Sequence, residues 1–172
     1  MAPKIVTATQ IGLRFTNVFG ALGPERFVTG HHTAGPKDTS DAHAMSLART
    51  YHADHARKGW GGLGYHYMIT RRGTILCLRP TALKGAHVGG HNSNNIGIVC
   101  NGTVGDRPSI RQRRALKWLL ANAHTAAMPK AHRTDVSLVH ATRRGHNDWS
   151  GHQSNACPGT HKKMYLSGGE TR

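Results

Sequence analysis

One long stretch of the chain repeats its apolar residues at the spacing of a helix. Between Ser109 and about Met128, these positions are Leu116, Leu119, Leu120, Ala123 and Ala127. The spacing places apolar side chains on one helix face, and serine is a favoured N-cap residue. A second helix is predicted over residues 41–58, "DAHAMSLARTYHADHARK", with capping residues at 38–41 before it and Gly59 after it.

Shorter apolar runs bounded by glycine and polar residues predict strands. They are "RFVTGHHTAG" (26–35), "NNIGIVCNG" (94–102), "DVSLVHA" (135–141) and the two runs that flank Arg72-Gly73, which together predict a β-hairpin. Strands and helices alternate without strict βαβ order. The chain is therefore expected to be an α/β protein, with a central mixed β-sheet flanked by α-helices.

Length and composition indicate one domain. The 172 residues can bury a core, and the sequence has no internal repeat or Pro/Ser-rich linker, so residues 1–172 are expected to form a single domain. The N-terminal "MAPKIVTATQIGLRF" lacks the apolar core of a signal peptide, and no run is long enough to span a membrane. Synthesis in a cytoplasm without a signal peptide is expected.

The net charge is +15, from 23 Lys and Arg against 8 Asp and Glu. A field of this sign favours a polyanionic partner. Nucleic acid and the anionic polymers or lipids of a bacterial envelope both fit, and composition alone does not separate them. Four basic residues crowd the first half of the predicted 109–128 helix: Arg111, Arg113, Arg114 and Lys117.

The three cysteines, an odd number at wide spacing, argue against a disulfide framework. Cys77 and Cys100 lie in apolar runs and are expected to be buried thiols. Cys157 lies instead in a polar loop that begins after His146, and His31 ends a predicted strand. Two imidazoles and one thiolate make a three-ligand zinc set that leaves a fourth position for water.

The residues leave other interpretations of Cys157 open. It can be a buried thiol without a metal, or a nucleophile whose base is His146 or His31. The nucleophile hypothesis is the weaker one, because Pro158 disfavours the helix N-terminus that usually activates such a cysteine.

Other histidines among the 14 are also candidate ligands. His52 and His55 are one helical turn apart, but an exposed helix face explains them more simply. His140 is an alternative to His146, although its place in an apolar run suits a buried histidine better.

Four blocks of the sequence resemble those of zinc-dependent N-acetylmuramoyl-L-alanine amidases. They are "VTGHHTAG", "GWGGLGYHYMITRRGT", "GAHVGGHNSNNIGIVCNG" and "GHNDWSGHQSNACPG", and they occur in the family's order over about residues 27–160. The superfamily includes phage lysozyme-like amidases and the peptidoglycan recognition proteins, and the "GWGGLGYHY" block is most similar to phage endolysins. The resemblance implies one amidase catalytic domain without a separate wall-binding domain.

The resemblance also implies roles for individual residues. His31, His146 and Cys157 match the family's ligands for one Zn²⁺ ion, and His32 is expected to point to the other face of its strand. Tyr65 matches the catalytic tyrosine near the metal. The positions that match the family's substrate groove are His87, Asn92, Asn94 and Asn95.

One position departs from the family pattern. Two residues before the cysteine, relatives carry a lysine or a threonine that stabilises the oxyanion, and here the residue is Asn155. Its amide can donate the same hydrogen bond. The loop from His146 to Cys157 is also longer than in those relatives, and His152 within it is the alternative donor.

The function implied is that of a peptidoglycan hydrolase, in particular a phage endolysin, which cleaves the amide between N-acetylmuramic acid and L-alanine with zinc-activated water. Anionic envelope polymers or lipids are then the expected partners of the basic surface, with the 111–117 segment as one contact. No dedicated nucleic-acid partner is expected, because no zinc-finger spacing occurs and only 6% of residues are aromatic. The protein is expected to be a monomer that is made in the host cytoplasm and acts on the cell wall after release.

The sequence is also compatible with two alternative functions. One is a non-lytic recognition protein that binds peptidoglycan; such proteins commonly lack the cysteine ligand, so Cys157 argues against it. The other is a cytoplasmic amidase that recycles muropeptides.

Overall fold

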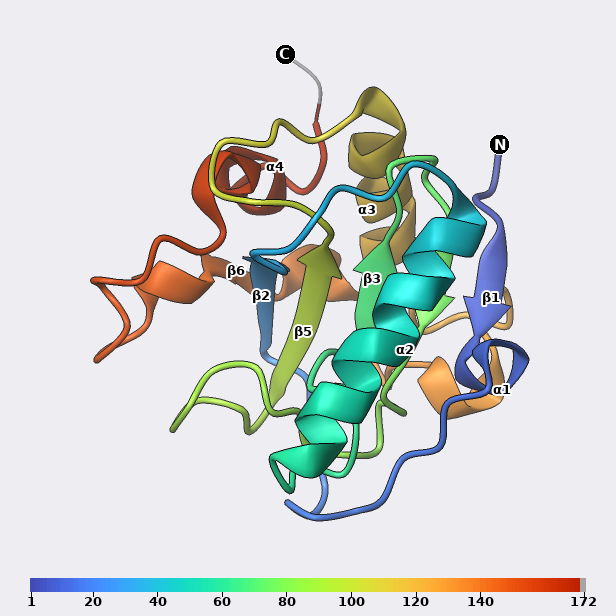
Figure 1. The fold of residues 1–172 in the computed structure, drawn as a ribbon, viewed down its shortest axis with the longest axis vertical. Helices are drawn as coiled ribbons and strands as arrows, with labels where there is room; N and C mark the ends of the chain where they lie inside the picture. Colours follow the sequence, from blue (N-terminus) through green and yellow to red (C-terminus); the bar gives the residue numbers. More distant parts are fainter. Residues whose placement is uncertain (171–172) are drawn as a thin grey trace.

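The computed structural model describes residues 1–170, which build a six-stranded β-sheet with helices on both faces (Figure 1). The order across the sheet is β1-β4-β3-β5-β2-β6. The neighbouring strands run parallel except for the antiparallel pair β3–β4, so the expected mixed sheet is confirmed. The strands are β1 (Ile5–Thr7), β2 (Phe27–His32), β3 (Tyr67–Ile69), β4 (Ile75–Cys77), β5 (Asn95–Cys100) and β6 (Thr142–Gly145).

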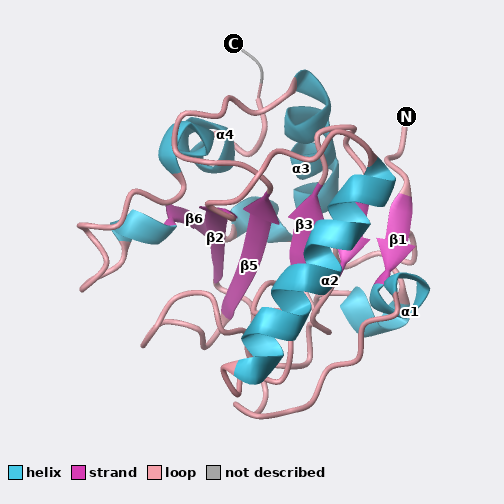
Figure 2. Ribbon diagram, in the orientation of Figure 1, coloured by secondary structure: helices cyan, strands magenta, loops and turns pink. Residues whose placement is uncertain are grey.

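Four α-helices and several single 3₁₀ turns accompany the sheet (Figure 2). The helices are α1 (Ala8–Ile11), α2 (Asp41–Arg57), α3 (Ile110–Asn122) and α4 (Lys162–Leu166). Ser40 and Ser109 cap α2 and α3 through hydrogen bonds that their hydroxyls accept from backbone N–H groups. Within residues 1–170, no helix is long and apolar enough to cross a membrane.

The two faces of the sheet bury separate hydrophobic clusters. Alternate side chains of β3 and β5, such as Tyr67 and Ile98, pack against α3 and α4 on one face. Met68 and Val99 point the other way and pack with Ala44 and Ala48 of α2. Helix α2 therefore covers one face of the sheet, and helices α3 and α4 cover the other.

Helix α2 leaves part of its own face of the sheet uncovered. In Figure 1 it crosses in front of β3, whereas β2 and β5 beside it have no helix in front of them. His31 of β2 is in register with Val99 of β5, so its side chain lies on this open face. His32 is in register with Cys100, whose side chain belongs to the α3 cluster, so the expected opposite orientation of His31 and His32 is confirmed.

Several predicted elements are confirmed. Helix α2 ends with Lys58 as its C-cap, directly before Gly59. Strands β3 and β4 form the hairpin around Arg72-Gly73, and Gly73 has the positive φ of 84° that the turn requires. Cys77 and Cys100 are fully buried free thiols.

The helix predicted to reach Met128 ends earlier, at Asn122. The side-chain amide of Asn122 donates to the carbonyl of Trp118, and the hydroxyl of Thr125 donates to the carbonyl of Asn122, so side chains of this segment compete for the backbone carbonyls at the end of the helix. As a result Ala127 is exposed rather than on the apolar face, and Met128 reaches the core from an irregular segment.

The strand predicted over residues 135–141 is wrong. That segment contains a 3₁₀ turn, Leu138–His140, and the strand β6 follows it with the polar sequence "TRRG". Only Leu138 of the run is buried, and His140 is exposed, which contradicts its interpretation as a buried histidine. Strand β6 pairs with β2 alone at the edge of the sheet, so it needs no alternation of apolar residues.

Candidate metal centre and adjoining cleft

Three donor side chains meet at the open face of the sheet. Strands β2 and β6 are parallel neighbours, so His31 near the end of β2 and His146 directly after β6 lie at the same edge. Cys157 reaches them from the loop that follows. One ligand atom from each of the three side chains lies within 4.8 Å of the others.

The spacing of these donors suits zinc. Sγ of Cys157 is 3.6 Å from Nδ1 of His31. Tetrahedral zinc, with a Zn–N bond of about 2.0 Å and a Zn–S bond of about 2.3 Å, holds a nitrogen and a sulfur about 3.5 Å apart. His31 and Cys157 therefore have the separation of two ligands on one zinc ion, and His146, whose ligand atom lies within 4.8 Å of theirs, is the candidate for the third.

The backbone positions the thiol of Cys157 despite its polar sequence surroundings. The side chain is buried, and the N–H of His32 donates a hydrogen bond to Sγ at 3.3 Å. The N–H of Cys157 donates to Oδ1 of Asn155 at 2.8 Å. Burial raises the pKa of the thiol to about 11, so a nearby cation is needed to hold it as the thiolate that binds metal.

The two histidine donors are neutral at physiological pH. Burial, reinforced by the neighbouring His87 and His146, lowers the pKa of His31 well below its usual value. Burial followed by the charge of His152 lowers the pKa of His146 to about 4. A neutral imidazole has the free lone pair that metal ligation requires.

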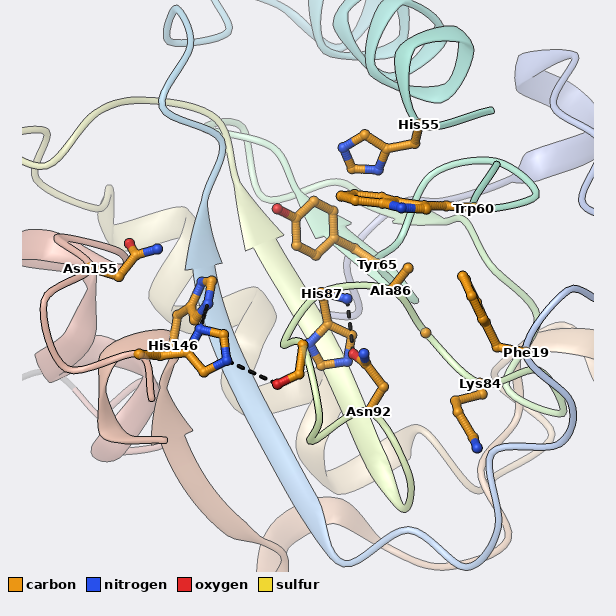
Figure 3. A pocket seen from close by; sticks show the side chains of 13 residues that line it. Phe19, His55, Trp60, Tyr65, Lys84, Ala86, His87, Asn92, His146 and Asn155 are labelled. Carbon is orange, nitrogen blue, oxygen red and sulfur yellow. Dashed lines mark hydrogen bonds between the residues drawn. The ribbon is translucent and has the colours of Figure 1, made fainter. Parts of the chain in front are cut away.

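A cleft of about 660 Å³ opens beside the three donors (Figure 3). His146 and Asn155 lie at one end, Phe19 and Lys84 lie at the other, and Tyr65 lies between them. The remaining lining residues are His55, Trp60, Gly85, Ala86, His87, Gly89, Asn92 and His152. A cleft of this size, with polar and aromatic side chains in its lining, is in the range of small-molecule binding sites.

Tyr65 lies next to the donors, as the resemblance implies. Its ring centroid is 5.0 Å from that of His31. Burial raises the pKa of its hydroxyl, so the group is a neutral hydrogen-bond donor. Asn155 is exposed in the cleft, and since its Oδ1 accepts from Cys157, its NH₂ group is the part that remains available to a ligand.

The four predicted groove residues separate into two pairs. His87 and Asn92 line the cleft, and Oδ1 of Asn92 accepts hydrogen bonds from the N–H groups of His87 and Val88. Asn94 and Asn95 do not line it, which corrects their assignment as groove residues. Asn94 adopts a left-handed turn conformation with φ of 59°, and Asn95 is fully buried.

Asn95 has a structural position instead. Its Oδ1 accepts a hydrogen bond from the hydroxyl of Thr29 at 2.9 Å, and its Nδ2 donates to the carbonyl of His91 at 2.8 Å. The sequence places it one residue before an apolar run, and this gives no sign of which asparagine turns inward.

The sequence suggested that His52 and His55 lie on an exposed helix face, and this interpretation is wrong. Both are half-buried, and their Nδ1 atoms accept hydrogen bonds from the N–H groups of Leu63 and Gly64. They thus hold the loop that leads to Tyr65, and His55 lines the cleft.

The sequence analysis missed part of the cleft lining. Phe19, Trp60 and Lys84 come from three separate loops. Trp60 offered one signal, because a tryptophan between glycines at a helix end has little local reason to be there.

The four basic residues of α3 lie away from the cleft. Arg111, Arg114 and Lys117 are exposed and Arg113 is half-buried. Helix α3 packs on the face of the sheet opposite α2, whereas the three donors lie on the α2 face. If α3 contacted an anionic envelope, the cleft would therefore face away from that envelope.

Comparison with known proteins identifies a matching family and similar proteins. The sequence model of the N-acetylmuramoyl-L-alanine amidase family matches residues 22–160. The endolysin of Klebsiella phage KP32 is 29% identical over 110 residues, which cover 59% of this chain and 70% of that protein. The endolysin of Escherichia phage T7 is 38% identical over 87 residues, 45% of this chain and 58% of that protein.

Solved structures share the fold. Wild-type Drosophila PGRP-LB superposes with a TM-score of 0.77 at 23% identity, covering 96% of this chain and 92% of that chain. The endolysin amidase LysCS from Clostridium intestinale gives a TM-score of 0.65 at 21% identity, covering 92% and 89%. At this identity the likeness concerns the fold alone.

Proposed function

The chain belongs to the N-acetylmuramoyl-L-alanine amidase family, a family of peptidoglycan hydrolases, and we propose that it cleaves the amide between N-acetylmuramic acid and the L-alanine of the stem peptide at a single zinc site. Membership confirms the resemblance carried by the four sequence blocks. The observations that support the zinc site are the convergence of His31, His146 and Cys157 beside the cleft and the separation of His31 from Cys157, which is close to that of two ligands on one tetrahedral ion.

The reaction adds one water molecule across the amide, leaving a carboxylate on the lactyl group of muramic acid and a free amino group on L-alanine. His31, His146 and Cys157 would hold a zinc ion, which when bound would supply Lewis-acid chemistry and lower the pKa of water to roughly 7. The side chains of this protein orient the reacting carbonyl. Two neutral hydrogen-bond donors, the hydroxyl of Tyr65 and the NH₂ group of Asn155, belong to residues that line the cleft next to the metal ligands. They would stabilise the negative charge that develops on the carbonyl oxygen.

We also propose that the protein acts as a phage endolysin that reaches the cell wall after release from the host cytoplasm. The similarity to two phage endolysins supports this role. The charge of +15 suits an anionic envelope, whose polymers or lipids would be a second partner beside peptidoglycan. A monomer remains the expected state, and light scattering of the purified protein would test it.

The decisive experiment measures what the protein releases from purified peptidoglycan, with chelator, without it, and after zinc is added back. We expect new L-alanine amino termini that vanish with chelator and return with zinc. His146→Ala should lose both zinc and activity, whereas His140→Ala, a matched change at an exposed histidine outside the cleft, should lose neither.

Other outcomes of this experiment would replace the proposal. No release by protein shown to carry zinc would favour a non-lytic peptidoglycan-binding protein. New reducing sugar ends would mean that a glycosidic bond is cut instead of the amide. Full activity in chelator would remove the metal from the mechanism.

A further inference from the structure

Each of the two candidate histidine ligands contacts a second histidine that the mechanism above does not use. Nε2 of His31 lies 3.1 Å from Nδ1 of His87. Nε2 of His146 lies 3.1 Å from Nδ1 of His152. The rings of His87 and His152 each also lie within hydrogen-bond distance of a backbone carbonyl. Both candidate metal ligands therefore belong to the same kind of hydrogen-bond chain, from ligand to second histidine to backbone carbonyl.

The hydrogen bonds of His87 determine which nitrogen of His31 carries a hydrogen. Nε2 of His87 lies 3.1 Å from the carbonyl oxygen of Asn95, which can only accept. In a neutral imidazole one nitrogen donates and the other accepts, so Nδ1 of His87 is an acceptor. Nε2 of His31 must then be the donor, which leaves the lone pair on its Nδ1, the atom 3.6 Å from Sγ of Cys157.

The hydrogen bonds of His152 determine the tautomer of His146 in the same way. Nε2 of His152 lies 2.9 Å from the carbonyl oxygen of Gly89 and donates to it. Nδ1 of His152 therefore accepts the hydrogen of Nε2 of His146. His146 is left with its lone pair on Nδ1, as in His31.

The fold reserves space for the ring of His87. A Cβ atom on Gly85 or on Gly97 would lie 2.6 Å from Cδ2 of His87, so neither position admits a larger residue without moving the ring. The N–H of His87 is held by Oδ1 of Asn92, and the residue is 7% exposed. The orientation of the ring is thus determined by packing as well as by hydrogen bonds.

We propose that His87 and His152 are positioning residues that hold His31 and His146 as the tautomers with hydrogen on Nε2, so that both offer Nδ1 to the metal. A hydrogen-bond acceptor on the other ring nitrogen of a metal-binding histidine orients the imidazole and raises its basicity. The proposal rests on the proposed zinc site. It also gives both nitrogens of His152 a partner within the protein, which leaves Asn155 as the oxyanion donor of the two candidates.

The first test reads the tautomers directly. Two-bond ¹H–¹⁵N spectra of histidine-labelled, metal-free protein should show hydrogen on Nε2 of both His31 and His146. No variant and no activity are needed for this measurement. Hydrogen on Nδ1 of either ring would overturn the proposal.

The second test measures zinc affinity by competition with a chromogenic chelator. His152→Leu removes the acceptor and should weaken zinc binding about 10- to 100-fold. His152→Asn places an oxygen close to the position of Nδ1 and should recover most of that loss. His91→Leu is the matched control, because Nε2 of His91 also reaches a backbone carbonyl, that of Ser150, but its ring bonds to neither donor.

The outcomes separate this proposal from the proposed function. Wild-type protein that binds no zinc contradicts the zinc site, and the positioning role falls with it. Wild-type protein that binds zinc, while His152→Leu binds it equally well, overturns the positioning role alone. An equal loss in His91→Leu would also overturn it, because general loosening of the loops would then explain the effect.

Discussion

At the scale of single residues, the environment of a side chain rather than its neighbours in sequence decides what it can do. Cys157 sits among polar residues in the chain and yet is 7% exposed in the structure, beside two neutral imidazoles. His140 lies in an apolar run and is exposed. Two predictions belong to this scale, and both concern neutral hydrogen-bond donors in the cleft.

Tyr65→Phe should slow amide hydrolysis about 100-fold and leave zinc affinity unchanged, because it removes one donor to the developing oxyanion and keeps the ring that packs against His31. Turnover and chelator competition on the same preparation check this. Tyr51→Phe is the matched control, since its buried hydroxyl has no hydrogen-bond partner among the described residues and is absent from the cleft lining. Loss of zinc in Tyr65→Phe would contradict the role.

Asn155→Asp should keep the fold and the acceptor for the N–H of Cys157 while removing the NH₂ donor. We expect turnover to fall by about 10²- to 10³-fold, the usual cost of one oxyanion donor. Asn17→Asp is a matched change, because its Oδ1 likewise accepts a backbone N–H, that of Gly20, outside the cleft. Undiminished turnover in Asn155→Asp would leave the oxyanion to Tyr65 and the metal.

At the scale of elements, one buried guanidinium holds the loop that carries Trp60 towards the cleft. Arg79 is fully buried after β4, and its N–H groups donate to the carbonyls of Trp60, Gly62, Leu63 and Lys84. Among residues 1–170 no carboxylate pairs with it, and burial lowers its pKa to about 10. Carbonyl dipoles thus take the place of an acidic partner.

Arg79→Lys should destabilise the protein by about 3 kcal/mol, because an ammonium cannot reach all these acceptors and leaves buried carbonyls without donors. We also expect weaker binding of peptidoglycan fragments, since the Trp60 loop loses its anchor. Urea unfolding and fragment titration measure the two effects. Arg133→Lys, which loses a guanidinium with a single bond to the carbonyl of Met128, provides the comparison.

At the scale of the whole molecule, the fold combines a high positive charge with many neutral, buried histidines. Burial lowers the pKa of His66 to about 4 and that of His87 to about 3, and His161 is lowered to about 4 in the same way. The net charge of +15 excludes these residues, so acid adds still more positive charge. Both features predict how the protein responds to solution conditions.

The free energy of unfolding of the metal-free protein should fall as the pH drops from about 6.5 to about 4. In that window the unfolded chain takes up protons on histidines that stay neutral when folded, and each such histidine contributes a slope of about 1.4 kcal/mol per pH unit. Urea unfolding at several pH values tests this. A free energy that is constant from pH 7 to pH 5 would contradict the prediction.

Lysis of whole cells should fall steeply as salt rises, because ions screen the attraction between the +15 protein and an anionic envelope. Hydrolysis of a small soluble fragment should change much less. Neutralising Arg111, Arg114 and Lys117 together should lower the salt dependence only in proportion to the charge removed, since α3 lies opposite the cleft. Lysis that is insensitive to salt would reject the electrostatic role.

Much of the architecture could be predicted from local patterns. The start of α3 at Ser109, the end of α2 before Gly59 and the Arg72-Gly73 hairpin follow from caps and turns, whose interactions span only a few residues. The end of α3 and the place of β6 were mispredicted, because side-chain hydrogen bonds at Asn122 and pairing of an edge strand with β2 override weak apolar periodicity.

The sequence by itself determined the family and the set of three candidate donors, because motif order and residue chemistry survive without coordinates. Only the tertiary structure decided that Asn95 turns inward while Asn92 lines the cleft, and that a ring nitrogen of His152 lies within hydrogen-bond distance of His146. It also decided that the basic face of α3 lies opposite the cleft. These are properties of contacts between segments far apart in the chain, and such contacts exist only after the sheet has brought the ends of β2 and β6 together.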